Sequence, residues 1–140
     1  MGDKSITMSD IPESEHPTLP EGQPLAVTAE GLYLANLLML PGVAFIAILW
    51  LYYRNKESAS KLALCHLRQA ISATLWAIVI ILVLNGVIIA SGGYGTSRMW
   101  MIIMVYFEVI HVPLILIGVV GALKALRGKP FKYPLIGVKC

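Results

Sequence analysis

Charged side chains are scarce in this sequence. Lysine, arginine, aspartate and glutamate make up 14% of its 140 residues, whereas 57% of the residues are hydrophobic. Soluble domains usually carry about a quarter charged residues, because charged groups cover the surface that faces water. The shortage of charge therefore excludes a soluble globular domain of this length and indicates a membrane protein.

Motifs of soluble enzymes are also missing. The sequence contains no phosphate-binding Walker loop, no nucleophile elbow, no HExxH zinc motif and no dinucleotide fingerprint. We therefore expect a protein that is not an enzyme and that has no catalytic, cofactor-binding or metal-binding residues. Nucleic acid is not expected as a partner either, because membrane topology already explains where the basic residues fall.

Three apolar stretches dominate the chain, at residues 32–53, 67–90 and 98–126. At about 1.5 Å per helical residue, each can cross a hydrocarbon core of about 30 Å. The expected fold class is therefore all-α, with three transmembrane helices in a domain over residues 31–126. Pro41 lies inside the first stretch and should kink it, because proline cannot donate a backbone hydrogen bond.

Residues 1–30 form an acidic, proline-rich segment. It carries one lysine and six acidic residues, Asp3, Asp10, Glu13, Glu15, Glu21 and Glu30. A segment with so few apolar residues cannot bury enough surface to fold alone. Two interpretations stay open: the segment is a disordered, solvated tail, or it is an arm that docks on a partner.

Basic residues are unequally divided between the two ends of the predicted helices. With three spans, the connector 54–68 and the basic C-terminal tail 127–140 share one side, which together with Lys124 just before the tail holds nine lysine and arginine residues. The other side holds only Lys4 and Arg98. Because lysine and arginine are enriched on the cytoplasmic side, we expect a multi-pass protein of the bacterial inner (plasma) membrane. Its C-terminus should lie in the cytoplasm and its N-terminal tail outside.

The chain has two cysteines, Cys65 and Cys140. Both are expected on the cytoplasmic side, where thiols stay reduced. The sequence therefore predicts no disulfide, and two isolated cysteines also make no zinc or iron–sulfur site.

The stretch "EVIH" places a carboxylate, Glu108, three residues before an imidazole, His111, inside the last apolar stretch. Di-iron bundles use this spacing, but they need a second such motif and further carboxylates, which the apolar stretches lack. We therefore expect Glu108 and His111 to form an intramembrane polar cluster with Asn36 and Asn85, or to contact a partner. A proton-relaying and a metal-linked role stay open.

Helical spacing places small residues on the same face as Glu108. They are Gly118, Gly121, Ala122 and Ala125. In membranes, small residues allow two helices to approach closely, so this face is predicted to pack against another helix.

Two motifs resemble a known family. The first is His66, Arg68, Gln69 and Ala70 at the start of the second stretch, and the second is Tyr133, Pro134, Ile136 and Gly137 near the C-terminus. Both are similar to the signatures of a widespread family of small bacterial integral membrane proteins of unknown function. That family is distantly similar to the twenty-kilodalton component of the chloroplast inner-envelope import machinery. The resemblance implies three or four helices and no established catalytic residues.

The same two motifs have a physical interpretation as a cytoplasmic interface. Arg68 is expected to meet lipid phosphates, Gln69 to satisfy backbone groups of a neighbouring segment, and His66 to pair with the segment that contains Tyr133 and Pro134. Anchoring at the membrane surface alone is the simpler alternative.

A bundle of three helices leaves little room for a substrate cavity. We therefore expect a non-enzymatic accessory or structural subunit, embedded in the lipid bilayer, that packs within a larger inner-membrane protein complex. Two alternatives remain: a translocation component that forms a homo-oligomeric passage, and an accessory subunit of a membrane metalloenzyme or respiratory complex.

Overall fold

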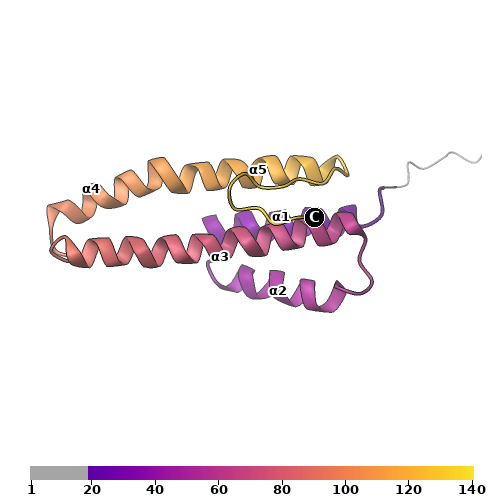
Figure 1. Ribbon diagram of the computed structural model, residues 1–140, viewed down its shortest axis with the longest axis horizontal. Coiled ribbons are helices and arrows are strands. Elements are labelled where there is room, and N and C mark those ends of the chain that lie inside the picture. Colours follow the sequence, from indigo (N-terminus) through magenta and orange to yellow (C-terminus); the bar gives the residue numbers. More distant parts are fainter. Residues whose placement is uncertain (1–18) are drawn as a thin grey trace, which may run out of the picture.

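The structure, a computed structural model, describes residues 19–140, and the regular elements in that range are all helices. Helices α1 (Gln23–Leu38) and α2 (Val43–Asn55) are short, and α3 (Lys61–Ala90) has 30 residues. A last continuous helix consists of α4 (Ser97–Tyr106), the π-helical segment η2 (Phe107–His111) and α5 (Val112–Leu126). The described chain is thus an arrangement of four helices (Figure 1).

The two long helices are the candidate membrane spans. Lys61–Ala90 and Ser97–Leu126 each have 30 residues, with mean hydropathies of 2.6 and 2.3 in their most apolar windows. They run antiparallel and are joined by a turn in which Gly92 and Gly93 have φ angles of 120° and 85°. Glycine adopts such positive φ angles without steric cost, which permits the sharp reversal.

The expected span over residues 32–53 is not a single helix. The chain leaves the helical conformation between Met39 and Gly42, because Pro41 has no backbone N–H and Gly42 has a φ of 86°. The Asn36 side chain holds this break by accepting a hydrogen bond from the Gly42 N–H at 3.0 Å. The kink predicted at Pro41 is therefore a complete reversal, and α2 returns beside α1.

Helices α1 and α2 are too short to cross a membrane separately. With 16 and 13 residues they measure about 24 Å and 20 Å, against a hydrocarbon core of about 30 Å. Together they form a hairpin that lies along the first half of α3 (Figure 1). The structure thus has two candidate spans and a hairpin where the sequence predicted three spans.

The hairpin brings the start of α1 beside the end of α5. The Gln23 side chain donates a hydrogen bond to the Leu126 carbonyl, and Pro20 lies against Gly128. Placing the N-terminal tail and the C-terminal tail on opposite sides of the helices required a single span over 32–53, and that span is absent. Residues 19–30 therefore lie at the same end as the C-terminal segment, and α1 already begins at Gln23, within the predicted tail. The rest of that tail, residues 1–18, lies outside the described residues.

Helix α1 packs between α3 and α5 through small side chains. Ala29 on α1 and Ala70 and Ala73 on α3 are fully buried, which allows close helix contact. Tyr33 fills the space between the helices and donates a hydrogen bond to the Leu114 carbonyl at 3.3 Å.

The predicted packing face of the last helix meets α1. Gly118 and Gly121 are buried, Ala125 is fully buried and Ala122 is half-buried. A Cβ atom at Gly118 would lie 2.7 Å from the Tyr33 ring. At Gly121 a Cβ atom would lie 2.6 Å from Glu30 Oε2, so only glycine leaves room for this carboxylate.

Gly121→Ala is expected to destabilise the protein by about 1–3 kcal/mol, because the added methyl group displaces the Glu30 carboxylate. Gly86→Ala is the matched control, since Gly86 is also helical and has no heavy atom within 4 Å of the added Cβ. There the change should stabilise by up to about 1 kcal/mol through helix propensity. Unfolding in mixed micelles with increasing SDS measures both values, and equal effects would contradict the close contact at Gly121.

Candidate functional site: a buried hydrogen-bonded cluster

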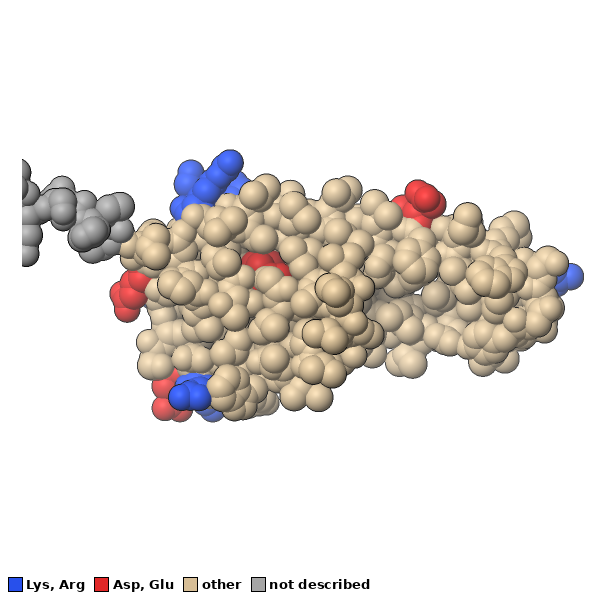
Figure 2. Space-filling model, turned by 180° about the vertical axis from the view of Figure 1, so that it is seen from behind, with Lys and Arg blue, Asp and Glu red and all other residues tan. Residues whose placement is uncertain are grey.

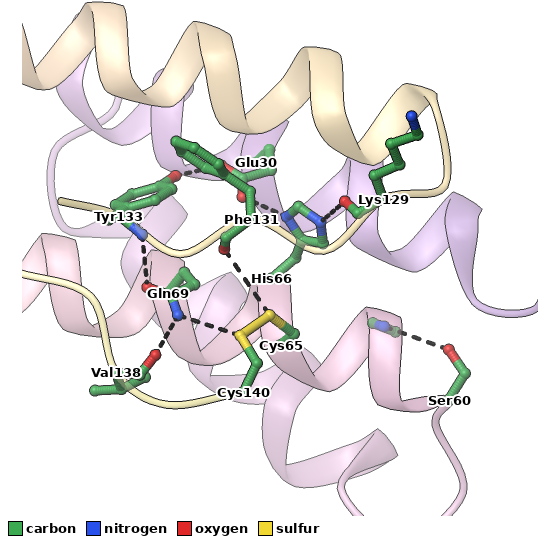
Figure 3. The surroundings of a disulfide bond; sticks show 11 residues. Glu30, Ser60, Cys65, His66, Gln69, Lys129, Phe131, Tyr133, Val138 and Cys140 are labelled. Atoms are coloured by element: carbon green, nitrogen blue, oxygen red, sulfur yellow. Dashed lines mark hydrogen bonds and ion pairs between the residues drawn. A yellow bond between two sulfur atoms is a disulfide. The ribbon is translucent and has the colours of Figure 1, made fainter.

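The most buried charged side chain in the described part of the chain is Glu30, on α1. Its Oε1 lies 2.6 Å from Nδ1 of His66 on α3, and its Oε2 accepts a hydrogen bond from the Tyr133 hydroxyl. Glu30 and His66 are 0% exposed and Tyr133 is 1% exposed. We call Glu30, His66, Gln69 and Tyr133 the Glu30 cluster; Figure 3 shows how it joins α1, α3 and the C-terminal segment.

Hydrogen bonding fixes the protons of this cluster. His66 Nε2 lies 3.1 Å from the Lys129 carbonyl oxygen, which can only accept, so Nε2 carries a hydrogen. The 2.6 Å between Nδ1 and Glu30 Oε1 is a hydrogen-bond distance, so a proton lies between these two atoms. Burial, with the neighbouring Glu30 carboxylate as a second cause, raises the pKa of Tyr133 above its ordinary value, so its hydroxyl stays a donor.

Gln69 ties the C-terminal segment to α3. Its Oε1 accepts a hydrogen bond from the Tyr133 N–H at 3.3 Å, and its Nε2 donates to the Val138 carbonyl at 2.6 Å. One turn further along α3, the Ser72 hydroxyl donates to the Ile136 carbonyl at 2.7 Å. Residues 127–140 are therefore not a free tail but a segment that runs inward along α3 and turns back (Figure 3).

The Tyr-Pro-x-Ile-Gly motif builds the turn of this segment. A Cβ atom at Gly137 would lie 2.7 Å from Gln69 Oε1 and would also collide with the Tyr133 carbonyl oxygen. Leu135, at the tip, has a φ of 65° and an exposed side chain. The motif thus places the Tyr133 side chain against Glu30 of α1 and leaves Pro134 exposed at the surface.

The prediction of no disulfide is wrong for this structure. Cys65 on α3 and Cys140 form a disulfide, with their Cα atoms 4.8 Å apart. The prediction rested on the reducing cytoplasm alone, whereas the returning segment places Cys140 beside the first turns of α3 (Figure 3). The expected cytoplasmic location was therefore not sufficient to predict whether Cys65 and Cys140 pair.

Alkylation tests the disulfide directly. Wild-type protein, quenched in acid and denatured, should add no polyethylene glycol maleimide before reduction and two after it, because a disulfide has no free thiolate. Cys140→Ser serves as the control, since its single remaining thiol should add one group without reduction. Two additions to unreduced wild-type protein would contradict the bond.

The four residues predicted to form an intramembrane polar cluster are not brought together. Glu108 is exposed on η2, and the Asn85 side chain donates to the Ile81 carbonyl at 2.7 Å and accepts from the Tyr94 hydroxyl. Asn36 and His111 do line one cavity of about 160 Å³. His111 Nδ1 lies 3.4 Å from the Tyr106 hydroxyl in the same cavity wall.

The "EVIH" stretch has an unusual backbone. Phe107–His111 is π-helical, and the Val112 N–H bonds to the Phe107 carbonyl five residues earlier. Pro113 follows directly and has no N–H to donate, so the carbonyl of Val109, four residues earlier, lacks its ordinary α-helical partner. Within the described residues, no group of three His, Cys, Asp or Glu side chains could hold a metal ion.

Glu30 was not among the predicted site residues, because it falls within the predicted acidic tail. A signal was nevertheless present: Glu30 is the only charged residue between Glu21 and Arg54, as Glu108 is the only one between Arg98 and Lys124. Of the motif residues, His66, Gln69 and Tyr133 belong to the cluster, whereas the Arg68 side chain is exposed.

Comparison with known proteins adds a family. A family model, described as the magnetosome magnetite crystal formation protein family (MamF/MmsF), matches residues 25–139. The match covers all the helices from α1 to α5 except the first two residues of α1, and it includes both motifs. No curated protein and no solved structure matches the chain. The similarity to the chloroplast import component stays a prediction.

Proposed function

The chain belongs to the magnetosome magnetite crystal formation protein family, and on this premise we propose that it is a non-enzymatic structural component of the magnetosome membrane. In this proposal it acts in crystal formation by packing against other membrane proteins, and η2 provides the contact. The Glu30 cluster serves to hold the fold together.

The observation that carries this proposal is the exposure of Glu108. It lies eleven residues after Ser97, which is about 16 Å along the helix and close to the middle of a hydrocarbon core of about 30 Å. Ionisable residues at this depth almost always face protein or water, because exposure to lipid is costly. A partner with a hydrogen-bond donor would satisfy Glu108, which this chain leaves exposed.

The surrounding surface agrees with a helical partner. Of the residues from Ser97 to His111, only Tyr106 is buried, and the outer half of α3 buries only Ala77 and Ile88. Large side chains beside Glu108, including Met104, Val105 and Val109, are more than half exposed. Lipid chains and apolar helices can both cover this apolar surface. The exposed Glu108 carboxylate identifies the part that a protein, rather than lipid, would contact in this proposal.

Charge distribution supports an orientation. Among the described residues, nine lysine and arginine residues lie towards the end of the molecule where α1 begins and α2 ends. Only Arg98 lies near the turn between α3 and α4. Figure 2 shows most of the blue atoms at one end of the molecule and a small blue group at the other; the surface between them is mostly tan, with red carboxylate atoms in places. The positive-inside rule then places the start of α1, the loop 56–60 and the C-terminal segment in the cytoplasm.

Purification from magnetosome membranes in mild detergent tests the proposal. We expect larger membrane proteins to co-purify with the wild-type chain, and Glu108→Ala to reduce them severalfold while the amount of the chain stays constant. Glu57→Ala, an exposed carboxylate outside the spans, is the matched control and should change nothing. Recovery of the chain alone would contradict the proposal. Recovery of the chain bound only to further copies of itself would favour the homo-oligomeric passage.

A further inference from the structure

We propose that the face of α3 next to the C-terminal segment is a binding site for one anionic phospholipid. The headgroup phosphate lies between Arg68 and Lys139, and an acyl chain follows α3 towards Trp76. The cavity for the headgroup is lined by no residue of η2 or of the Glu30 cluster.

The headgroup end is a cavity of about 400 Å³. Its wall contains Arg68 on α3, Lys139 on the returning segment and Tyr52 on α2, together with Ile71, Ser72, Leu75 and Val138. Arg68 and Lys139 are exposed and have no carboxylate within ion-pair distance among the described residues. Two cations without an ion pair beside a cavity suit a phosphate group, and basic pockets between membrane helices bind such headgroups.

The acyl-chain end continues from the same cavity. Ser72 and Leu75 also line a second cavity with Trp76 and Val79, and those two residues line a third cavity between α3 and α4. The first cavity thus leads into a lining that becomes almost entirely apolar. Charge at one end and apolar surface at the other match the two parts of a phospholipid.

Depth agrees with one lipid in one leaflet. Arg68 and Val79 are eleven residues apart on α3, which corresponds to about 16 Å, or half of a hydrocarbon core of about 30 Å. The returning segment supplies Lys139 because Gln69 and the disulfide hold Val138 and Cys140 against α3. An unanchored C-terminus would leave Arg68 as the single cation of the cavity.

Quenching of tryptophan by brominated lipids tests the site. The chain has three tryptophans, Trp50, Trp76 and Trp100. The double variant Trp50→Phe/Trp100→Phe therefore keeps only Trp76, which lines the apolar cavities. In phosphatidylcholine vesicles with a small fraction of brominated phosphatidylglycerol, Trp76 should be quenched severalfold more than random mixing gives. The same fraction of brominated phosphatidylcholine should give the random value.

Charge removal should abolish this preference. Arg68→Gln and Lys139→Gln are each expected to lower the relative affinity for phosphatidylglycerol about fivefold, which corresponds to the roughly 1 kcal/mol of one basic residue near an anionic surface. Arg127→Gln, at the same end but outside the cavities, is the matched control and should keep the preference at Trp76. Circular dichroism of each variant shows that the helices are retained.

Three results would overturn the proposal. Equal quenching of Trp76 by the two brominated lipids shows no selective site. Loss of the preference in Arg127→Gln as well shows general surface charge rather than a site. Loss of the preference on adding inorganic phosphate, at an ionic strength matched with chloride, shows a site for a free anion rather than for a lipid. None of these results depends on a protein partner at Glu108, so the proposed function is tested separately.

Discussion

Glu30→Ala is expected to lower the free energy of unfolding by about 3–5 kcal/mol. The change leaves the His66 imidazole and the Tyr133 hydroxyl, both buried, without the carboxylate that now bonds to them. Unsatisfied buried donors of this kind are costly, because no water replaces the lost partner. SDS titration in mixed micelles, followed by circular dichroism, measures the loss.

Glu108→Ala is the control for this experiment. It removes the same side chain, but Glu108 is exposed and has no hydrogen bond within the described residues, so a change within about 0.5 kcal/mol is expected. His66→Ala and the double variant complete a thermodynamic cycle, in which the double loss should be smaller than the sum of the single losses. Additive losses would show that Glu30 and His66 act independently.

Thiol labelling is expected to place residues 21 and 57 on one side of the membrane and residue 95 on the other. Glu21 precedes α1, Glu57 follows α2, and Gly95 lies in the turn between the long helices. A hairpin returns the chain to the side where it entered, whereas three spans would put residues 21 and 57 on opposite sides. The hairpin and the three-span topology therefore predict different relative sides for residues 21 and 57, with no intermediate result.

Substituted cysteines and an impermeant maleimide make the measurement. Glu21→Cys and Glu57→Cys should react in inverted vesicles and be protected in spheroplasts, and Gly95→Cys should behave in the reverse way. All three positions are exposed, and wild-type protein gives the baseline because its two cysteines are paired. Reaction of residues 21 and 57 from different sides would reinstate the span over 32–53.

Local sequence patterns predicted part of this fold well. Apolar length was sufficient for the helical class and for the two long helices, because hydropathy over about twenty residues directly reflects the bilayer. It was insufficient at residues 39–42, where Pro41 was expected to kink a span. Whether a proline kinks or ends a helix depends on its neighbours, and here Gly42 and the Asn36 side chain complete the reversal.

The Glu30 cluster could not be derived from local patterns. Glu30 and Tyr133 are 103 residues apart, and the two cysteines are separated by 75 residues. Such pairs depend on the returning C-terminal segment, which has no helical or strand periodicity to reveal its path. Short motifs identified His66, Gln69 and Tyr133 as a group, and only the three-dimensional arrangement added their carboxylate.

The hairpin of α1 and α2 gives the molecule a taper. Near the basic end the cross-section contains four helices and the returning segment, whereas beyond the hairpin it contains α3 and the last helix alone (Figure 1). This tapered molecule occupies more area in one leaflet of the bilayer than in the other. Copies that crowd together with the same orientation would therefore favour a membrane that curves, with the wide, basic end on its convex surface.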